Sequence, residues 1–152
     1  MQEVFRPAVR WIVVNDKNEV LLVQHKKGNW AIPGGGLDFW ENLFDWLKRE
    51  FMEELWVDIK IGKIIFLQDF LFEKNWQKAH SLEYFFLVEN YKDFEKIKET
   101  YQKSSHSFEL KDVKFFSLEN FPENFKPQNL KKVLQKYFEN KQNFNCEYVS
   151  GI

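Results

Sequence analysis

An arginine and three glutamates stand at close spacing in one short segment of this chain, Arg49, Glu50, Glu53 and Glu54. At about 100° per residue, the three glutamates fall within roughly 100° of one another around a helix. Carboxylates on one face repel each other unless a positive charge lies among them. Mg²⁺ suits such a face, because proteins hold it through a few carboxylates together with substrate phosphate. The spacing therefore predicts a helix that binds a divalent cation.

Arg49 is expected to make a second contact. Its planar guanidinium can donate two parallel hydrogen bonds to a carboxylate, and Glu41 at the start of the helix is the candidate acceptor. Alternatively, the three glutamates form only a solvated face with charge partners one helical turn away. The three glycines at 34–36 and the adjacent Arg49-Glu50 pair favour the metal site.

The helix that must position these residues is expected from 41 to about 55. Apolar residues recur there at every fourth position, Leu43, Leu47, Phe51 and Leu55. Residues 26–38 hold four of the six glycines, so we expect a loop whose backbone approaches another group closely.

The rest of the chain alternates strand and helix patterns. Buried strands are expected at 9–15, 19–24, 59–73, 81–89 and 113–116. The first two are expected to pair across the polar turn at 16–18. A second amphipathic helix is expected at 127–141, residues 93–103 are either a short polar helix or an ordered loop, and no period marks the tail from 142. Strands interleaved with two helices predict an α/β sandwich.

Composition limits the class of protein. A chain of 152 residues is one domain long, so we expect a single domain over 1–152. A formal net charge of -1 gives no sign of a nucleic-acid partner, and no apolar run approaches the length of a membrane span. The only cysteine, Cys146, cannot form an internal disulfide, and no signal peptide starts the chain. These features predict a soluble, cytoplasmic protein with neither a nucleic-acid nor a membrane partner.

Residues 35–57 resemble the Nudix box, whose pattern is G-x5-E-x7-R-E-U-x-E-E-x-G-U, with U an apolar residue. The matching positions are Gly35, Glu41, Arg49, Glu50, Phe51, Glu53, Glu54 and Val57. Trp56 stands where the pattern has its final glycine. The preceding residues 30–35, Trp-Ala-Ile-Pro-Gly-Gly, also resemble the approach to the box in this family.

The resemblance implies a fold and an activity. The fold would be the Nudix α/β/α sandwich, with a mixed central sheet and the box as a loop–helix–loop. The activity would be metal-dependent hydrolysis of a phosphoanhydride in a nucleoside diphosphate linked to another moiety. Nucleoside triphosphates, ADP-ribose-like molecules and nucleotide sugars all stay open as substrates, and a homodimer stays open as the assembly.

The resemblance also implies roles. Carried over by position, Glu50, Glu53 and Glu54 would bind Mg²⁺ or Mn²⁺, with the Gly35 carbonyl as a further ligand. The metal would stabilise charge on the phosphoryl oxygens and lower the pKa of water. Glu53 is our leading candidate for contact with the attacking water.

Other residues carry weaker expectations. Arg49 and Glu41 join Glu53 in the expected catalytic group. Glu83, within an apolar strand, and Glu109, shortly before the strand at 113–116, are candidates for a further carboxylate near the substrate. The histidines show no metal-ligand spacing and are expected to be structural or exposed, namely His25, His80 and His106.

Two further classes of function compete with the hydrolase. One is a binding or regulatory module of the same fold without turnover, for which Trp40 and Trp56 leave room. The other is a structural interaction domain that lacks a divalent-metal site. Metal-dependent release of phosphate products would separate the hydrolase from both.

Five of the six tryptophans stand where their presence is unexpected. Trp56 and Trp40 occupy positions at which this pattern has, or usually has, glycine, and Trp76 follows Asn75 where Asn-Gly is the common hairpin turn. Trp46 lies on the glutamate side of the helix, and Trp11 opens a buried strand. Either they are true tryptophans of an aromatic-rich protein, or they mark UGA codons that the source organism reads as glycine. The 19 Lys against 3 Arg are compatible with an AT-rich genome.

Overall fold

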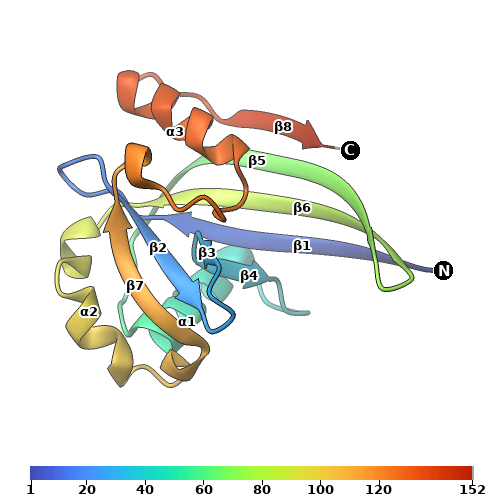
Figure 1. Cartoon of the computed structure of the whole chain (residues 1–152), viewed down its shortest axis with the longest axis horizontal. Helices are drawn as coiled ribbons and strands as arrows, with labels where there is room; N and C mark the ends of the chain where they lie inside the picture. The colour runs from blue at the N-terminus through green and yellow to red at the C-terminus, as the bar shows by residue number, and fades with distance from the viewer. Residues whose placement is uncertain (152) are drawn as a thin grey trace.

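The computed structural model describes residues 1–151, apart from the side chain of Ser107. Eight strands form two sheets, and three α-helices pack on the outside of these strands (Figure 1). The elements in chain order are β1 (Gln2–Ile12), β2 (Val20–His25), β3 (Trp30–Ala31), β4 (Gly34–Gly36), α1 (Leu43–Leu55), β5 (Ile61–Lys74), β6 (Gln77–Val88), α2 (Ile97–Thr100), β7 (Leu110–Phe116), α3 (Asn129–Glu139) and β8 (Glu147–Gly151). Short 3-10 turns complete the chain, η1 (Tyr91–Phe94), η2 (Tyr101–Lys103), η3 (Ser107–Glu109) and η4 (Leu118–Asn120).

The larger sheet is mixed, as expected from the resemblance. Its strand order is β4-β1-β6-β5-β8, with β1 parallel to β6, β5 antiparallel to β6 and β8 parallel to β5. The smaller sheet has the order β3-β2-β7 and is antiparallel. The long strands β1, β5 and β6 therefore form the centre of the sheet against which the helix with the glutamates packs.

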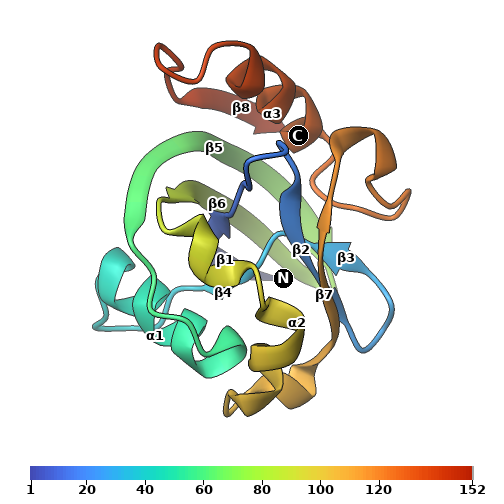
Figure 2. The ribbon, with the colours of Figure 1, turned by 90° about the vertical axis from the view of Figure 1, so that its left-hand side faces the viewer.

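Two separate cores make the molecule a sandwich. Along β1, Val9 and Trp11 belong to the core beneath α1, whereas Ile12 belongs to the core beneath α3. Alternate residues of a strand point to opposite faces, so one apolar strand supplies both cores. Helices α1 and α3 lie on opposite sides of the strands (Figure 2). The α/β/α arrangement with a mixed sheet is confirmed.

One expected strand pairing is confirmed only beside its turn. The Val14–Val20 bridge joins the two segments there, and the amides of Asn15 and Leu21 donate to the carbonyls of Glu19 and Val13, both at 3.0 Å. Farther from the turn, β2 leaves β1 and pairs with β3 and β7 in the second sheet. Both strands are buried on two faces, so apolar alternation could not tell which neighbour each would choose.

Some element boundaries also differ from the expectation. The segment 26–38 is not loop throughout, because it contains β3 and β4. The tail, for which no period was found, contains β8 in parallel with β5. Residues 93–103 combine short helical turns with α2. Within residues 1–151, no helix has the length and apolar character needed to cross a membrane.

Candidate active site

Helix α1 presents the glutamates, and its ends fix where it begins and stops. Asn42 caps the first turn, its side-chain oxygen accepting from the Asp45 amide at 3.0 Å. Trp56 ends the helix in the left-handed conformation, and its amide donates to the Met52 carbonyl at 3.3 Å. On the opposite side of the helix, Leu47 and Phe51 are fully buried. This apolar anchoring turns the glutamates toward the loop of β4.

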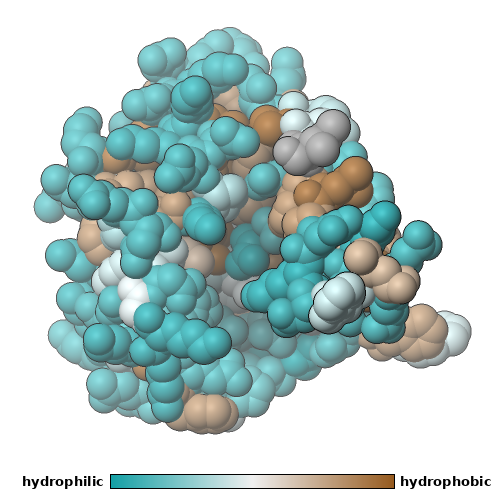
Figure 3. Space-filling model, turned by 45° about the vertical axis from the view of Figure 1, so that its right-hand side comes forward, coloured by the Kyte–Doolittle hydropathy of each residue, from teal (hydrophilic) through white to brown (hydrophobic). Residues whose placement is uncertain are grey.

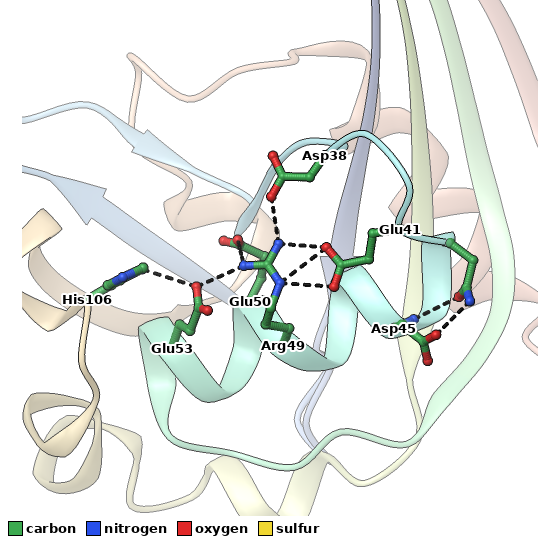
Figure 4. A network of polar contacts seen from close by, with 8 residues as sticks. Asp38, Glu41, Asp45, Arg49, Glu50, Glu53 and His106 are labelled. Atoms are coloured by element: carbon green, nitrogen blue, oxygen red, sulfur yellow. Dashed lines mark hydrogen bonds and ion pairs between the residues drawn. The ribbon is translucent and has the colours of Figure 1, made fainter.

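Arg49 is the centre of a carboxylate network (Figure 4). Its Nε and Nη2 donate to Glu41 at 3.0 and 2.8 Å, so the expected Arg49–Glu41 contact is present. Its Nη1 donates to both Glu50 and Glu53 at 3.0 Å, and Nη2 also reaches Asp38 at 2.9 Å. The hydrogen bonds from Arg49 lower the pKa of Glu41, and in return those to Glu41 contribute most to a raised pKa of Arg49.

His106 reaches the same network from a different part of the chain. Its Nδ1 lies 3.3 Å from Glu53 Oε2, and its backbone amide donates to the Glu53 carbonyl at 2.7 Å. The segment that follows α2 is thus tied to the helix at Glu53. Among the described groups, which leave out the Ser107 side chain, none donates a hydrogen bond to the other carboxylate oxygen, Glu53 Oε1.

Glu54 differs from its neighbours because it has no partner. Within the described part of the chain, its side chain accepts no hydrogen bond and forms no ion pair. Burial, with the charges of Glu50 and Glu109, raises the pKa of Glu54 to about 8. Burial also raises the pKa of Glu50, although Arg49 opposes this effect. A carboxylate that is half-buried without a partner is costly to ionise, so this position fits a bound cation.

No ready cage for a cation is formed by the protein groups alone. Over residues 1–151, no three histidine, cysteine or acidic side chains converge closely enough to hold a metal ion. Arg49 Nη1 lies between Glu50 and Glu53, and its positive charge neutralises both carboxylates. The expected face of three carboxylates therefore exists, but in this structure an arginine neutralises two of them.

The glycine-rich segment brings backbone against the sheet. Gly34 has a φ of 147°, and a Cβ there would lie 2.2 Å from the Val9 carbonyl oxygen. Only glycine allows this approach. Gly35 pairs with Val9 across β1 and β4, and its Cβ position would lie 3.5 Å from the Trp46 ring. The close backbone approach predicted for this segment is confirmed, and its nearest partner is strand β1.

A cavity of about 820 Å³ lies over strands β1 and β6, and its lining does not include the three glutamates of α1. Arg10 and Glu83 face it from β1 and β6, joined by an ion pair at 3.4 Å, and Trp30 and Phe70 add aromatic walls. Arg10 also acts on Glu54, since its charge partly offsets the rise in pKa caused by burial. Figure 3 shows a largely hydrophilic face of the molecule that is hollowed near its middle.

The weaker candidates from the sequence take distinct places. Glu83 is buried at 9% exposure and points to the cavity, not to solvent. Glu109 is exposed in η3, yet its charge contributes to the raised pKa of Glu54. His25 lines the cavity, and burial followed by the charge of Arg10 lowers its pKa. His80 is exposed and contacts Asp69, as expected for a residue outside the site.

Three residues of the site were missed by sequence reasoning. Arg10 had a signal, because it is the only charged residue in the apolar run 7–14. Asp38 and His106 had none, since neither stands at a spacing that marks a contact. Asp38 meets Arg49 across eleven residues and His106 meets Glu53 across more than fifty, and only folding brings them together.

Comparison with known proteins identifies the family of the chain. A sequence profile of the NUDIX domain matches residues 4–137. The chain belongs to the NUDIX domain family. The family assignment made from the box is confirmed, and the match extends far beyond the 23 residues of the box itself.

One curated Nudix relative is similar over a short stretch. An RNA pyrophosphohydrolase of Ruthia magnifica subsp. Calyptogena magnifica is 43% identical over 54 residues, which are 35% of this chain and 30% of that protein. The match thus spans less than a third of the relative's length.

Solved structures share the Nudix fold over nearly the whole chain. An ADP-ribose pyrophosphatase from Streptococcus suis has a TM-score of 0.63 at 18% identity, covering 96% of this chain and 98% of that one. A MutT protein from Methanosarcina mazei has a TM-score of 0.61 at 19% identity, covering 94% and 99%. At such identities these structures establish the fold alone.

Proposed function

We propose that this Nudix chain hydrolyses a phosphoanhydride bond in a nucleoside diphosphate linked to another moiety, with Mg²⁺ or Mn²⁺. The observation that carries the proposal is Glu54, a half-buried carboxylate without a hydrogen-bond partner among the described residues, beside Glu50 and Glu53 on one helix. Family membership supports it, as does a cavity of about 820 Å³ whose lining residue Arg10 acts electrostatically on Glu54.

The residues fit a divalent cation. Glu50, Glu53 and Glu54 would hold it, with the Gly35 carbonyl as a further oxygen ligand. Hard cations prefer oxygen donors, and a positive charge would remove the penalty of ionised Glu54. When bound, the metal would stabilise charge on the phosphoryl oxygens and lower the pKa of water.

Glu53 is proposed to orient the attacking water. Its Oε2 is held by Arg49 at 3.0 Å and lies 3.3 Å from His106, which fixes the carboxylate from two sides. Its Oε1 accepts no hydrogen bond from the groups that the structure describes, Ser107 apart, and can accept one from water. Arg49, itself braced by Glu41, acts as a positioning residue that keeps Glu53 in place.

The cavity is proposed to hold the nucleoside or its linked moiety. Its volume lies within the range of small-molecule sites, roughly 300–1,000 Å³. Trp30 and Phe70 offer faces on which a planar ring can stack. Gln68 also lines the cavity, and its buried Oε1 has no protein partner in the described chain, so it can accept from a ligand donor. Nucleoside triphosphates, ADP-ribose-like molecules and nucleotide sugars all meet these requirements.

A substrate panel tests the proposal. Nucleoside triphosphates, ADP-ribose and nucleotide sugars would be incubated with Mg²⁺ or Mn²⁺, and the products separated and identified. We expect metal-dependent release of a nucleotide from at least one class. Glu53→Gln should keep the fold and lower turnover by at least ~10²-fold. Glu139→Gln, an exposed glutamate on α3, is the matched control. Wild-type turnover in Glu53→Gln and Glu54→Gln alike would refute the assignment.

A binding module without turnover is the second candidate, and one observation favours it. Arg49 already neutralises Glu50 and Glu53, and no three acidic, histidine or cysteine side chains of the described residues converge to hold a metal ion. Binding of a nucleotide with no product under any metal condition would support this second function over hydrolysis.

We place the protein in the cytoplasm, since Cys146 is a free, exposed thiol that suits a reducing compartment. Whether it works as a monomer or as a homodimer is testable by light scattering at the concentrations of the assay.

A further inference from the structure

Three of the six tryptophans have a backbone that favours glycine. Trp40, Trp56 and Trp76 have φ angles of 68°, 59° and 62°. For a bulky L-residue this left-handed region is a genuine outlier. The only other non-glycine residues with positive φ in the described chain are Asn18 and Asn75, and asparagine tolerates it.

Other aromatic residues do not share this conformation. The chain has 17 Phe and 5 Tyr, and none of those described has a positive φ. The anomaly therefore follows tryptophan specifically and not aromatic side chains as a class. An explanation of the positive φ must therefore be specific to tryptophan at these positions.

The local structures at these positions are ones that glycine normally completes. Asn75 and Trp76 join β5 to β6 with φ of 52° and 62°, and a type I′ turn needs positive φ at both central residues. Trp56 ends α1 in the left-handed conformation, and the residue that adopts this conformation after a helix is usually glycine. Trp40 and Trp76 are 93% and 86% exposed, so packing does not compensate for their backbone strain.

The two buried tryptophans are anomalous in a different way. Trp11 and Trp46 are 0% and 2% exposed, and neither indole N–H has a hydrogen-bond partner within residues 1–151. A buried Trp N–H usually finds one. The rings of Trp11 and Phe51 also lie with centroids only 3.8 Å apart, closer than the roughly 4.5–7 Å of ordinary aromatic pairs. Trp11 therefore crowds the contact between α1 and the sheet, and Trp46 packs in the same core.

Trp30 shows what an ordinary tryptophan looks like in this fold. Its φ is not positive, and its ring packs edge-on against Phe116 at 4.8 Å. It also lines the proposed substrate cavity. Tryptophan suits this one position of the six.

We infer that the native polypeptide carries glycine at positions 11, 40, 46, 56 and 76, because its source organism decodes UGA as glycine. Read with UGA as tryptophan, the same gene gives the present sequence. Position 30 carries UGG and true tryptophan. The inference rests on backbone conformation and packing, so it is independent of the hydrolase proposal.

The substitution has a consequence for the site. Glycine at 46 removes the ring that lies beside Gly35, and glycine at 11 removes the ring pressed against Phe51. The change at 11 relieves the close contact between the sheet and Phe51 of α1, the helix that carries the glutamates. The native form is therefore expected to be the more active one.

The gene and the native protein give the direct test. We expect UGA at codons 11, 40, 46, 56 and 76 and UGG at codon 30, with glycine in the corresponding peptides of protein isolated from its source. UGG at any of the five positions, or UGA at codon 30, would overturn the inference as stated.

Stability of the present chain gives an independent test. Trp40→Gly and Trp76→Gly should each raise the midpoint of thermal unfolding by roughly 2–4 °C, because each removes strain and little packing. Phe39→Gly is the matched control, since Phe39 is 90% exposed beside Trp40 but has an ordinary φ. It should leave the midpoint unchanged or lower it. A fall in both tryptophan variants, like that in the control, would contradict the inference.

Discussion

Replacing Glu54 by glutamine should stabilise the metal-free protein while disabling its site. Burial, with the charges of Glu50 and Glu109, raises the pKa of Glu54 from 4.5 to about 8. A raised carboxyl pKa means that the folded state holds the proton more tightly than the unfolded state. Ionised Glu54 therefore opposes folding; the penalty begins near pH 4.5, grows with pH and is complete above about pH 8.

The size of the effect follows from the two pKa values. Their difference corresponds to about 5 kcal/mol at full ionisation. Relaxation of the protein and water near a partly exposed side chain reduce this to roughly 2–3 kcal/mol. For a chain of this length, that is a rise of roughly 5–10 °C in the midpoint of thermal unfolding. Near pH 5 the gain should fall below about 1 kcal/mol.

Urea unfolding followed by circular dichroism measures the difference. Wild type, Glu54→Gln and the control Glu139→Gln would be compared at pH 5 and pH 8 in EDTA, then again with Mg²⁺. At pH 8 in EDTA we expect Glu54→Gln to have a larger free energy of unfolding than wild type. Mg²⁺ should raise this free energy only for wild type and the control. If the free energies of unfolding of Glu54→Gln and wild type differ by the same amount at both pH values, ionisation of Glu54 does not oppose folding and the reasoning is refuted.

Three further predictions concern the surrounding contacts. Arg49→Lys should lower kcat at least about tenfold with an unchanged far-ultraviolet spectrum, because one ammonium cannot replace the guanidinium fork; steady-state kinetics test this, and wild-type kcat would refute it. His106→Ala should lower kcat about two- to tenfold through looser placement of Glu53, and an effect on stability alone would count against that positioning role. Hydrogen bonds from His80 and then Tyr148 lower the pKa of Asp69, so this group stabilises the fold above its usual pKa and loses the effect as pH falls through the lowered value. Asp69→Asn should therefore have a lower urea midpoint than wild type at pH 7, and this gap should close as pH falls below the usual pKa of an aspartate; equal midpoints at pH 7 would contradict it.

The helix of the site was predictable because its information is local. Apolar residues at every fourth position define the buried side of α1, and the same periodicity places Glu50, Glu53 and Glu54 together on another side. The Arg49–Glu41 contact was also predictable, since both residues lie within one loop–helix unit. Expected and observed bounds of this helix differ by two residues at its start.

Long-range pairing was less predictable. Strand β2 was expected beside β1 but joins β7, and β8 gave no periodic signal although it pairs with β5. Strands buried on both faces carry apolar residues throughout, so their patterns suit many neighbours. Which neighbour is chosen depends on how all the apolar surfaces are covered at once.

The sequence by itself determined the family, the helix with its three glutamates and the positions at which tryptophan is out of place. Each of these depends on residue type and on spacing along a short stretch of chain. Only the tertiary structure decided that Arg49 neutralises Glu50 and Glu53, that His106 reaches Glu53, and that Glu54 is left without a partner. It also decided the left-handed backbone at Trp40, Trp56 and Trp76. Charge pairing, burial and backbone strain depend on which distant segments meet, and that is set by packing of the whole chain rather than by any local pattern.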